Sequence, residues 1–261
     1  MQQNSFSQIG RPGQFLIAFL VLILCIGSVF ADEPSGEPDT SLTVSLGYVS
    51  TSGNSKTTTG NFKSSYMAKW KKFDFGANAS FIFTDVKDLD TGETSRNTEK
   101  YTVLLKSDYR IAKKGSVFLN LGWQKDRPSG IQNNFSIASG LGRTLKDTKI
   151  AKLKFGLGLE GFRETKIINE VESTNSRMAM YFQLDYQYRF NPQNTIRITN
   201  ETRMSFSNYN DYRVTTAISY VSAINHTLAL EVAFQDNFKN LPVEGKQKSD
   251  TISTVNLVFK F

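Results

Sequence analysis

The chain has 261 residues, 39% of them hydrophobic and 12% aromatic, and a formal net charge of +7. The mean hydropathy of -0.33 argues against a helical membrane protein. It remains compatible with a membrane β-barrel, in which only every second strand residue faces lipid. Lys and Arg are spread along the chain without a basic helix or cluster, which disfavours nucleic-acid binding.

The N-terminus has the pattern of a cleaved secretory signal peptide. Arg11 precedes an apolar run over Phe15–Phe30, and acidic, proline-containing sequence follows Ala31. A permanent transmembrane anchor is one alternative, although the run is short for a span of ~20 residues. A lipoprotein modified at Cys25 is another, although Leu24 stands where a small residue is needed. Cleavage after Ala31 would remove the single cysteine, which suits an oxidising compartment.

Three regions follow from this pattern. Residues 1–31 are predicted to be the signal peptide, 32–40 a short disordered acidic tail, and 41–261 one outer-membrane β-barrel domain. Within the last region, apolar residues recur with a period of two, in twelve segments separated by turn residues. The segments are expected at 41–51, 55–70, 73–86, 96–111, 116–127, 133–146, 151–165, 174–190, 194–208, 210–225, 227–239 and 248–261.

The alternation predicts strands with one apolar and one polar face. In segment 73–86, Phe81 and Phe83 share a face, whereas Asp74 and Asn78 lie on the other. The segments are longer than most strands of soluble proteins. They match a tilted membrane strand with its hydrated ends. We therefore expect an all-β fold, a transmembrane antiparallel up-and-down β-barrel of about twelve strands; ten or fourteen strands remain open.

The connections support this division. Pro128, Pro192 and Pro242 all fall between segments, as a closed barrel requires, because proline cannot donate to a strand ladder. Connections after even-numbered segments are short, which predicts periplasmic turns with both chain ends on that side. Longer outer loops are expected at 87–95, 166–173 and 240–247.

The C-terminal segment has a further signal. Val255, Leu257, Phe259 and Phe261 form an apolar row that ends in the terminal aromatic residue. Bacterial barrels resemble this closely, since their last strand ends in an aromatic residue that the barrel-assembly machinery recognises. Phe261 is thus the predicted assembly signal.

Three stretches carry a family resemblance. They are Gly47-Tyr48-Val49-Ser50-Thr51-Ser52-Gly53-Asn54-Ser55, then Phe135 with Ser139-Gly140-Leu141-Gly142, and Phe155-Gly156-Leu157-Gly158-Leu159. The first resembles the opening of the YdiY-like or salt-induced outer-membrane protein family, catalogued as a domain of unknown function, and the others resemble its glycine-rich strands. The resemblance implies an outer-membrane barrel from about residue 41 to 261, with no established activity and no functional residues to carry over.

Catalytic and metal sites are not expected. Outer-membrane proteases and phospholipases use histidine as the general base. The single histidine, His226, is predicted in a periplasmic turn beside Asn225. With one histidine, a metal site would have to use carboxylates. One acidic group, Asp85, Asp88, Asp90 and Glu93, is interpreted as a solvated loop, with a calcium-binding loop as the alternative. No cofactor is predicted, and the chain is expected not to be an enzyme.

The inward face is predicted to be rich in cations, with fewer acids. The candidate lumen-lining residues are Lys152, Lys154, Arg189, Arg197, Arg203 and Arg213. Paired charges that fill a narrow interior are one interpretation. A narrow pore that prefers anions is the other. Inward-facing Gly122, Gly140, Gly142, Gly156 and Gly158 could either leave one wall low for a solute or serve strand curvature.

The sequence thus predicts an exported barrel of the outer membrane of a Gram-negative-type bacterium. The leading hypothesis is a narrow pore for small anionic solutes or a stress-related envelope protein. An outer-membrane enzyme and a surface receptor or adhesion module are the alternatives. Expected partners are outer-membrane lipid, the barrel-assembly machinery and small anionic solutes, without nucleic acid.

Overall fold

The structure, a computed structural model, describes residues 38–51, 55–88, 91–126, 130–168, 171–242 and 247–261. The predicted signal peptide lies outside these ranges. In the described residues no helix has the length and apolar character needed to cross a membrane. The strands are β1 (Asp39–Thr51), β2 (Ser55–Lys69), β3 (Phe73–Asp88), β4 (Thr94–Arg110), β5 (Gly115–Asp126), β6 (Ile131–Asp147), β7 (Ala151–Ile168), β8 (Val171–Arg189), β9 (Asn194–Ser205), β10 (Tyr212–Ala223), β11 (Leu228–Lys239) and β12 (Ser249–Lys260).

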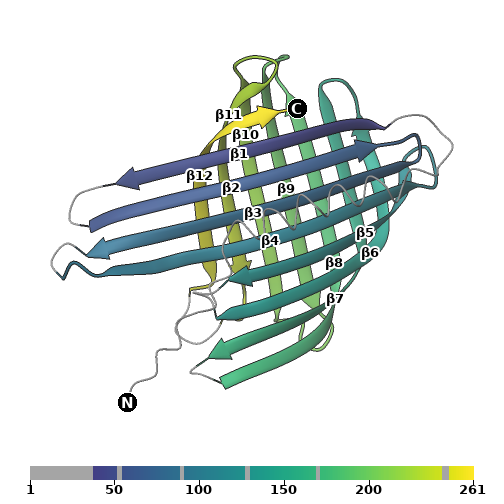
Figure 1. Cartoon of the computed structure of the whole chain (residues 1–261). Helices are drawn as coiled ribbons and strands as arrows, with labels where there is room; N and C mark the ends of the chain where they lie inside the picture. Colours follow the sequence, from purple (N-terminus) through teal and green to yellow (C-terminus); the bar gives the residue numbers. More distant parts are fainter. Residues whose placement is uncertain (1–37, 52–54, 89–90, 127–129, 169–170, 243–246) are drawn as a thin grey trace. The chain divides into compact units, whose positions relative to one another are not determined.

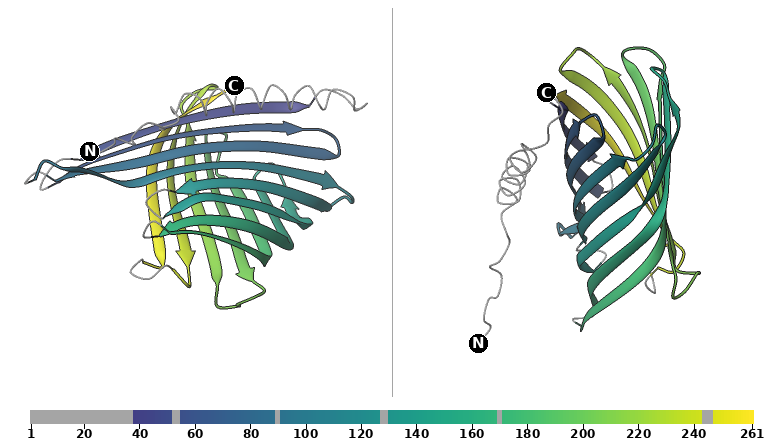
Figure 2. Two further views of the ribbon diagram at one scale, coloured as in Figure 1. Left: turned by 60° about the horizontal axis from the view of Figure 1, so that its bottom comes forward. Right: turned by 90° about the vertical axis from the view of Figure 1, so that its right-hand side faces the viewer.

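The described strands form one closed antiparallel barrel in which each strand pairs with its neighbours in sequence and β12 pairs with β1. Strands β1–β4 cross in front of β9–β12 at a steep angle (Figure 1), as expected where strands tilt against the barrel axis. Strands β5–β8 connect these two walls (Figure 2). The prediction of a twelve-stranded up-and-down barrel is confirmed.

Two of the expected outer loops are shorter in the structure. The one expected at 87–95 is shortened because Lys87 pairs with Thr94. The outer loop expected at 166–173 is wrong, because β7 extends to Ile168 and β8 begins at Val171, with Lys166 still paired to Ser173. The hydroxyls of Thr165 and Thr174 lie 3.0 Å apart within this extension. Polar residues keep a ladder here because hydrogen bonding between strands depends on the backbone, so alternating polar residues were misread as a loop.

The two faces of the wall have opposite character. Outward-facing apolar side chains are exposed over the middle of the strands: Leu46, Val117, Leu119, Leu121, Phe135, Ile137, Leu141, Leu157, Leu159, Met178, Met180, Ile218, Leu230, Val232, Phe234, Val255 and Leu257. An exposed apolar surface of this extent marks contact with another apolar phase. On a closed barrel it fits the lipid-facing band of a membrane protein.

The inward glycines serve curvature and packing rather than an open wall. A Cβ on Gly140 would overlap the carbonyl oxygen of Leu157, and one on Gly158 would overlap that of Ser139. The backbones of β6 and β7 therefore approach more closely than other residues allow. The space in front of Gly156 is occupied by the side chains of Phe118 and Gln183, 2.9 Å and 2.8 Å from an ideal Cβ.

A small aromatic cluster covers this glycine wall from inside. Phe118 and Tyr181 are almost fully buried, their ring centroids lie 5.9 Å apart, and Ala138 packs with them. The glycines make room for these rings, because any larger inward residue would occupy the same space. One side of the lumen is thereby filled by side chains.

Candidate functional site: the barrel lumen

The interior of the barrel contains a cavity of about 1670 Å³ lined by residues of β2–β12. Its lining is strongly charged. Among the described residues that line it, Lys and Arg outnumber Asp and Glu by fourteen to ten. The site is therefore a basic, polar chamber inside an apolar shell.

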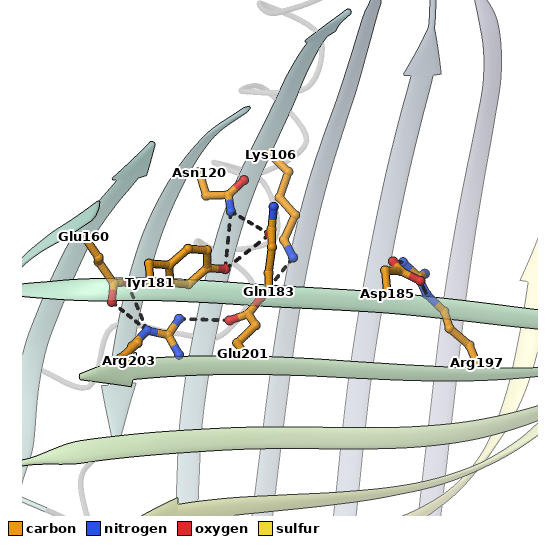
Figure 3. Close-up of polar contacts among 9 residues, drawn as sticks. All are labelled: Lys106, Asn120, Glu160, Tyr181, Gln183, Asp185, Arg197, Glu201 and Arg203. Carbon is orange, nitrogen blue, oxygen red and sulfur yellow. Dashed lines mark hydrogen bonds and ion pairs between the residues drawn. The ribbon is translucent and has the colours of Figure 1, made fainter. Parts of the chain in front are cut away.

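A chain of ion pairs crosses the chamber (Figure 3). The Lys106 ammonium on β4 lies 3.0 Å from a Glu201 carboxylate oxygen on β9. Arg203 donates to Glu201 at 2.9 Å and to Glu160 on β7 at 3.0 Å. Glu160 is 2% exposed, so its charge depends on Arg203 for compensation. This chain of charges narrows the lumen by linking opposite walls.

The aromatic cluster continues into this network. The Arg203 guanidinium lies 5.4 Å from the centroid of the Tyr181 ring, a cation–π distance. Asn120 on β5 donates to Gln183 on β8 at 3.2 Å, and the Tyr181 hydroxyl donates to the same Gln183 oxygen at 3.4 Å. Charged, aromatic and amide groups thus fix one another on the β5–β9 side.

The sequence-predicted cations occupy different environments. Lys152, Lys154, Arg197, Arg203 and Arg213 line the cavity. Arg189 lies exposed at the end of β8 and is not among the lining residues. Most of the others are paired: Lys154 lies 2.7 Å from Asp108, Arg197 donates to Asp185 at 3.1 Å, Arg213 lies 3.2 Å from Glu164, and Lys152 lies 3.6 Å from Asp147 at the rim.

Of the described lining residues, nine further cations were not among the candidates, and two of them lie deep in the lumen-facing rows of β4 and β11. Lys100 on β4 and Lys239 on β11 make no ion pair within 4.0 Å in the described part of the chain. Lys239 is within electrostatic range of Arg213, Lys166 and Lys100, with Glu164 as the single nearby acid in that group. Alternation places both lysines inward, but their lack of partners depends on strand register across the lumen, which sequence does not reveal.

Other inward residues were missed for a similar reason. Phe118, Tyr181 and Phe162 point inward and were not among the lumen-lining candidates. Phe162 lies beneath the Arg213 guanidinium, 5.2 Å from ring centroid to Cζ. The alternation could have identified them as inward residues, because they lie two positions from the polar residues Ser116, Gln183 and Glu164 respectively.

The remaining candidates form no site in the described residues. His226 is exposed in the turn between β10 and β11, as predicted, where Asn225 accepts hydrogen bonds from the backbone of Thr227 and Leu228. In the acidic loop, Asp85 is held by Arg96 at 2.6 Å, and Asp90 lies outside the described residues. Among the residues described, no group of three or more potential ligands is gathered for a metal ion.

Both the family that the sequence matches and the solved structures that it resembles agree with a barrel. Residues 44–261 match the model of a family described as "Protein of unknown function, DUF481". This match confirms the resemblance stated from the glycine-containing strands. No curated protein matches the sequence.

Solved barrels resemble the chain at low identity. The translocator domain of the autotransporter NalP from Neisseria meningitidis is 7% identical, with 95% of this chain and 97% of that chain covered and a TM-score of 0.47. The NanC porin is 10% identical, with 84% and 97% covered and a TM-score of 0.47. The COG4313 outer membrane channel from Pseudomonas putida F1 is 10% identical, with 88% and 97% covered and a TM-score of 0.47.

Proposed function

The chain belongs to the DUF481 family of proteins of unknown function, and we propose that it is an outer-membrane barrel forming a narrow pore with a preference for small anions. The exposed apolar exterior supports the membrane location. Export by the N-terminal signal peptide and assembly through Phe261 are parts of the same proposal. Phe261 ends the strand that closes the barrel, and its backbone exchanges hydrogen bonds with Leu42.

One observation carries the preference for anions: the lining has an excess of cations, and Lys100 and Lys239 are left without an ion-pair partner in the described residues. A positively charged pore attracts anions and repels cations. Because the low-dielectric wall weakens screening, unpaired charges influence a passing ion more than surface charges do. The proposal includes no catalytic step.

The test is the conductance of the full chain in a planar bilayer with a KCl gradient. We expect discrete steps and a reversal potential on the anion-selective side. The double variant Lys100→Glu/Lys239→Glu makes the count of lining cations and acids equal, twelve to twelve instead of fourteen to ten. It should lose most of the preference for chloride.

The matched control is Lys71→Glu/Lys72→Glu, which changes the net charge equally but lies exposed in the turn between β2 and β3, outside the lining. It should keep the wild-type reversal potential. A silent bilayer, given a heat-modifiable folded band on a gel, would contradict the pore and favour a lumen filled by structural ion pairs.

A further inference from the structure

The seam that closes the barrel is short. Pairing between β1 and β12 covers Thr43–Leu46 with Leu257–Lys260. However, β1 continues to Thr51 and β12 begins at Ser249. Across the described seam, the outer halves of these two strands therefore have no ladder, and Figure 1 shows them diverging from the paired segment. Unpaired backbone groups at membrane depth occur only where they face protein or a polar cavity.

Side chains replace the ladder on the lumen side. Asn61 on β2 donates to Asn256 on β12 at 2.9 Å, and Asn256 donates to Glu231 at 2.7 Å. The two asparagines meet in front of Gly47 on β1, where a Cβ would overlap both amide oxygens. The Oδ1 atom of Asn61 is buried without a hydrogen-bond partner among the described residues. We call Asn61, Asn256 and Glu231 the latch; it is incompletely satisfied and can open without breaking a backbone ladder.

The apolar belt is short beside the seam. Counting from the periplasmic end, β11 has four apolar outward positions before Asp236, which are Leu228, Leu230, Val232 and Phe234, and β12 has three before Ser253, which are Phe259, Leu257 and Val255. On β8 six such positions follow one another: Tyr188, Tyr186, Leu184, Phe182, Met180 and Met178. A bilayer thins locally where the apolar height of a protein is small. The bilayer is therefore expected to be thinner beside β11 and β12 than beside β8.

The cavity reaches the inner side of this seam. Ile252 and Thr254 of β12 line it together with Asn61 and Lys63 of β2, so that lining residues flank β1 on both sides. The Lys63 ammonium lies 3.9 Å from Glu231, and its side chain is 41% exposed. A cation and one amide oxygen without a partner among the described residues thus lie just behind the unpaired strands.

From these observations we propose that the outer half of the β1–β12 seam is a lateral opening for the acyl chain of an anionic amphiphile. The chain would lie between β1 and β12 toward the bilayer, and the anionic head would remain in the cavity near the Lys63 ammonium. Passage requires the latch to separate, together with the Lys63–Glu231 ion pair that spans the same strands. This path is distinct from an axial route for small ions, and neither proposal depends on the other.

The test measures whether lipid chains reach the lumen at the seam. Single cysteines are introduced into the full chain carrying Cys25→Ser, and each cysteine is labelled with a fluorophore. The protein is then placed in vesicles of brominated phosphatidylglycerol, whose acyl chains quench the fluorescence on contact. The positions are Ile252→Cys inside the seam, Ser253→Cys on the outward face, and Thr199→Cys inside the wall at β9. We expect a loss of fluorescence at Ile252 that approaches the loss at Ser253, and little loss at Thr199.

Latch variants make the test specific. Asn256→Ala in the Ile252→Cys protein should increase quenching, because both hydrogen bonds of the latch are lost and only the 3.9 Å Lys63–Glu231 ion pair still links the two sides of the seam. Asn120→Ala, which removes an amide hydrogen bond on the opposite wall, is the matched control and should leave quenching unchanged. Each protein must first show the heat-modifiable folded band. Quenching at Ile252 no greater than at Thr199, with or without the latch, would overturn the proposal.

Discussion

The wall of β7 and β8 and the seam of β1 and β12 use the same antiparallel ladder to very different extents. Cα pairing in the wall is continuous from Ala151↔Tyr188 to Ile168↔Val171. Pairing in the seam ends at Leu46↔Leu257. Behind the wall lie a buried ion pair and two aromatic rings packed at a tilt, whereas behind the seam lies a pair of hydrogen-bonded asparagines. The difference teaches that a closed barrel can concentrate rigidity in one sector and leave another easy to open.

The largest effect is expected from breaking the buried charges of the wall. Arg203→Ala leaves Glu160, 2% exposed, without its compensating cation. Removing one partner of a buried ion pair costs about 3–5 kcal/mol. The free energy of unfolding, measured by denaturant titration of the barrel in vesicles, should fall by about that amount.

The seam offers the matched comparison. Lys63→Ala removes a looser contact to Glu231, 3.9 Å long and with the lysine 41% exposed. Exposed pairs of this kind contribute about 0–1 kcal/mol. Equal losses for Lys63→Ala and Arg203→Ala would show that the wall and the seam do not differ in the way proposed.

Alternation and chain ends were sufficient to predict the barrel, its strand number and the direction of most side chains. The reason is that a period of two assigns each residue to one face, as in Phe81 and Asn78. The site was less predictable. Lys106 meets Glu201 across the lumen, 95 residues apart in sequence, and this pairing depends on barrel diameter and register. The short seam depends on the same quantities.

The next effect concerns the close approach of β6 and β7. Gly140→Ala would place a Cβ against the carbonyl oxygen of Leu157, which belongs to the backbone and has little freedom to move. Overpacking of this kind costs about 1–3 kcal/mol. Gly161→Ala, whose Cβ would have ordinary contact at 3.8 Å with Ile137, is the control. Denaturant titration should separate the two variants, and identical midpoints would refute the packing role assigned to Gly140.

Amide hydrogen exchange tests the ladders directly. In β12, the backbone amides between Ser249 and Asn256 that point toward β1 have no partner in the described seam. We expect them to exchange at least about tenfold faster than the amides of β8 between Tyr181 and Tyr188. This corresponds to a difference of roughly 1.4 kcal/mol in opening free energy. The measurement is mass spectrometry of peptides after exchange in vesicles. Equal protection of β12 and β8 would mean that the seam is closed by pairing that the described register lacks.

The smallest effect on stability should come from lengthening the apolar belt beside the seam. Asp236→Leu/Ser253→Val extends the outward apolar rows of β11 and β12. Substitutions on an exposed face usually change the free energy of unfolding by about 0.5 kcal/mol or less. The Asp236→Leu change also removes the hydrogen bond that Ser249 donates to the Asp236 carboxylate. The bilayer beside the seam should thicken, and quenching at Ile252 by brominated lipid should decrease.

A control isolates belt height from added hydrophobicity. Ser176→Val lies on the outward, exposed face of β8, beyond Met178 and far along the fully paired wall. It should change neither the unfolding midpoint nor the quenching at Ile252. If the seam variant and this control behave alike, the thin belt has no part in opening the seam, and the latch alone would have to account for access. If only the seam variant loses quenching, local bilayer thickness controls how readily chains enter between β1 and β12.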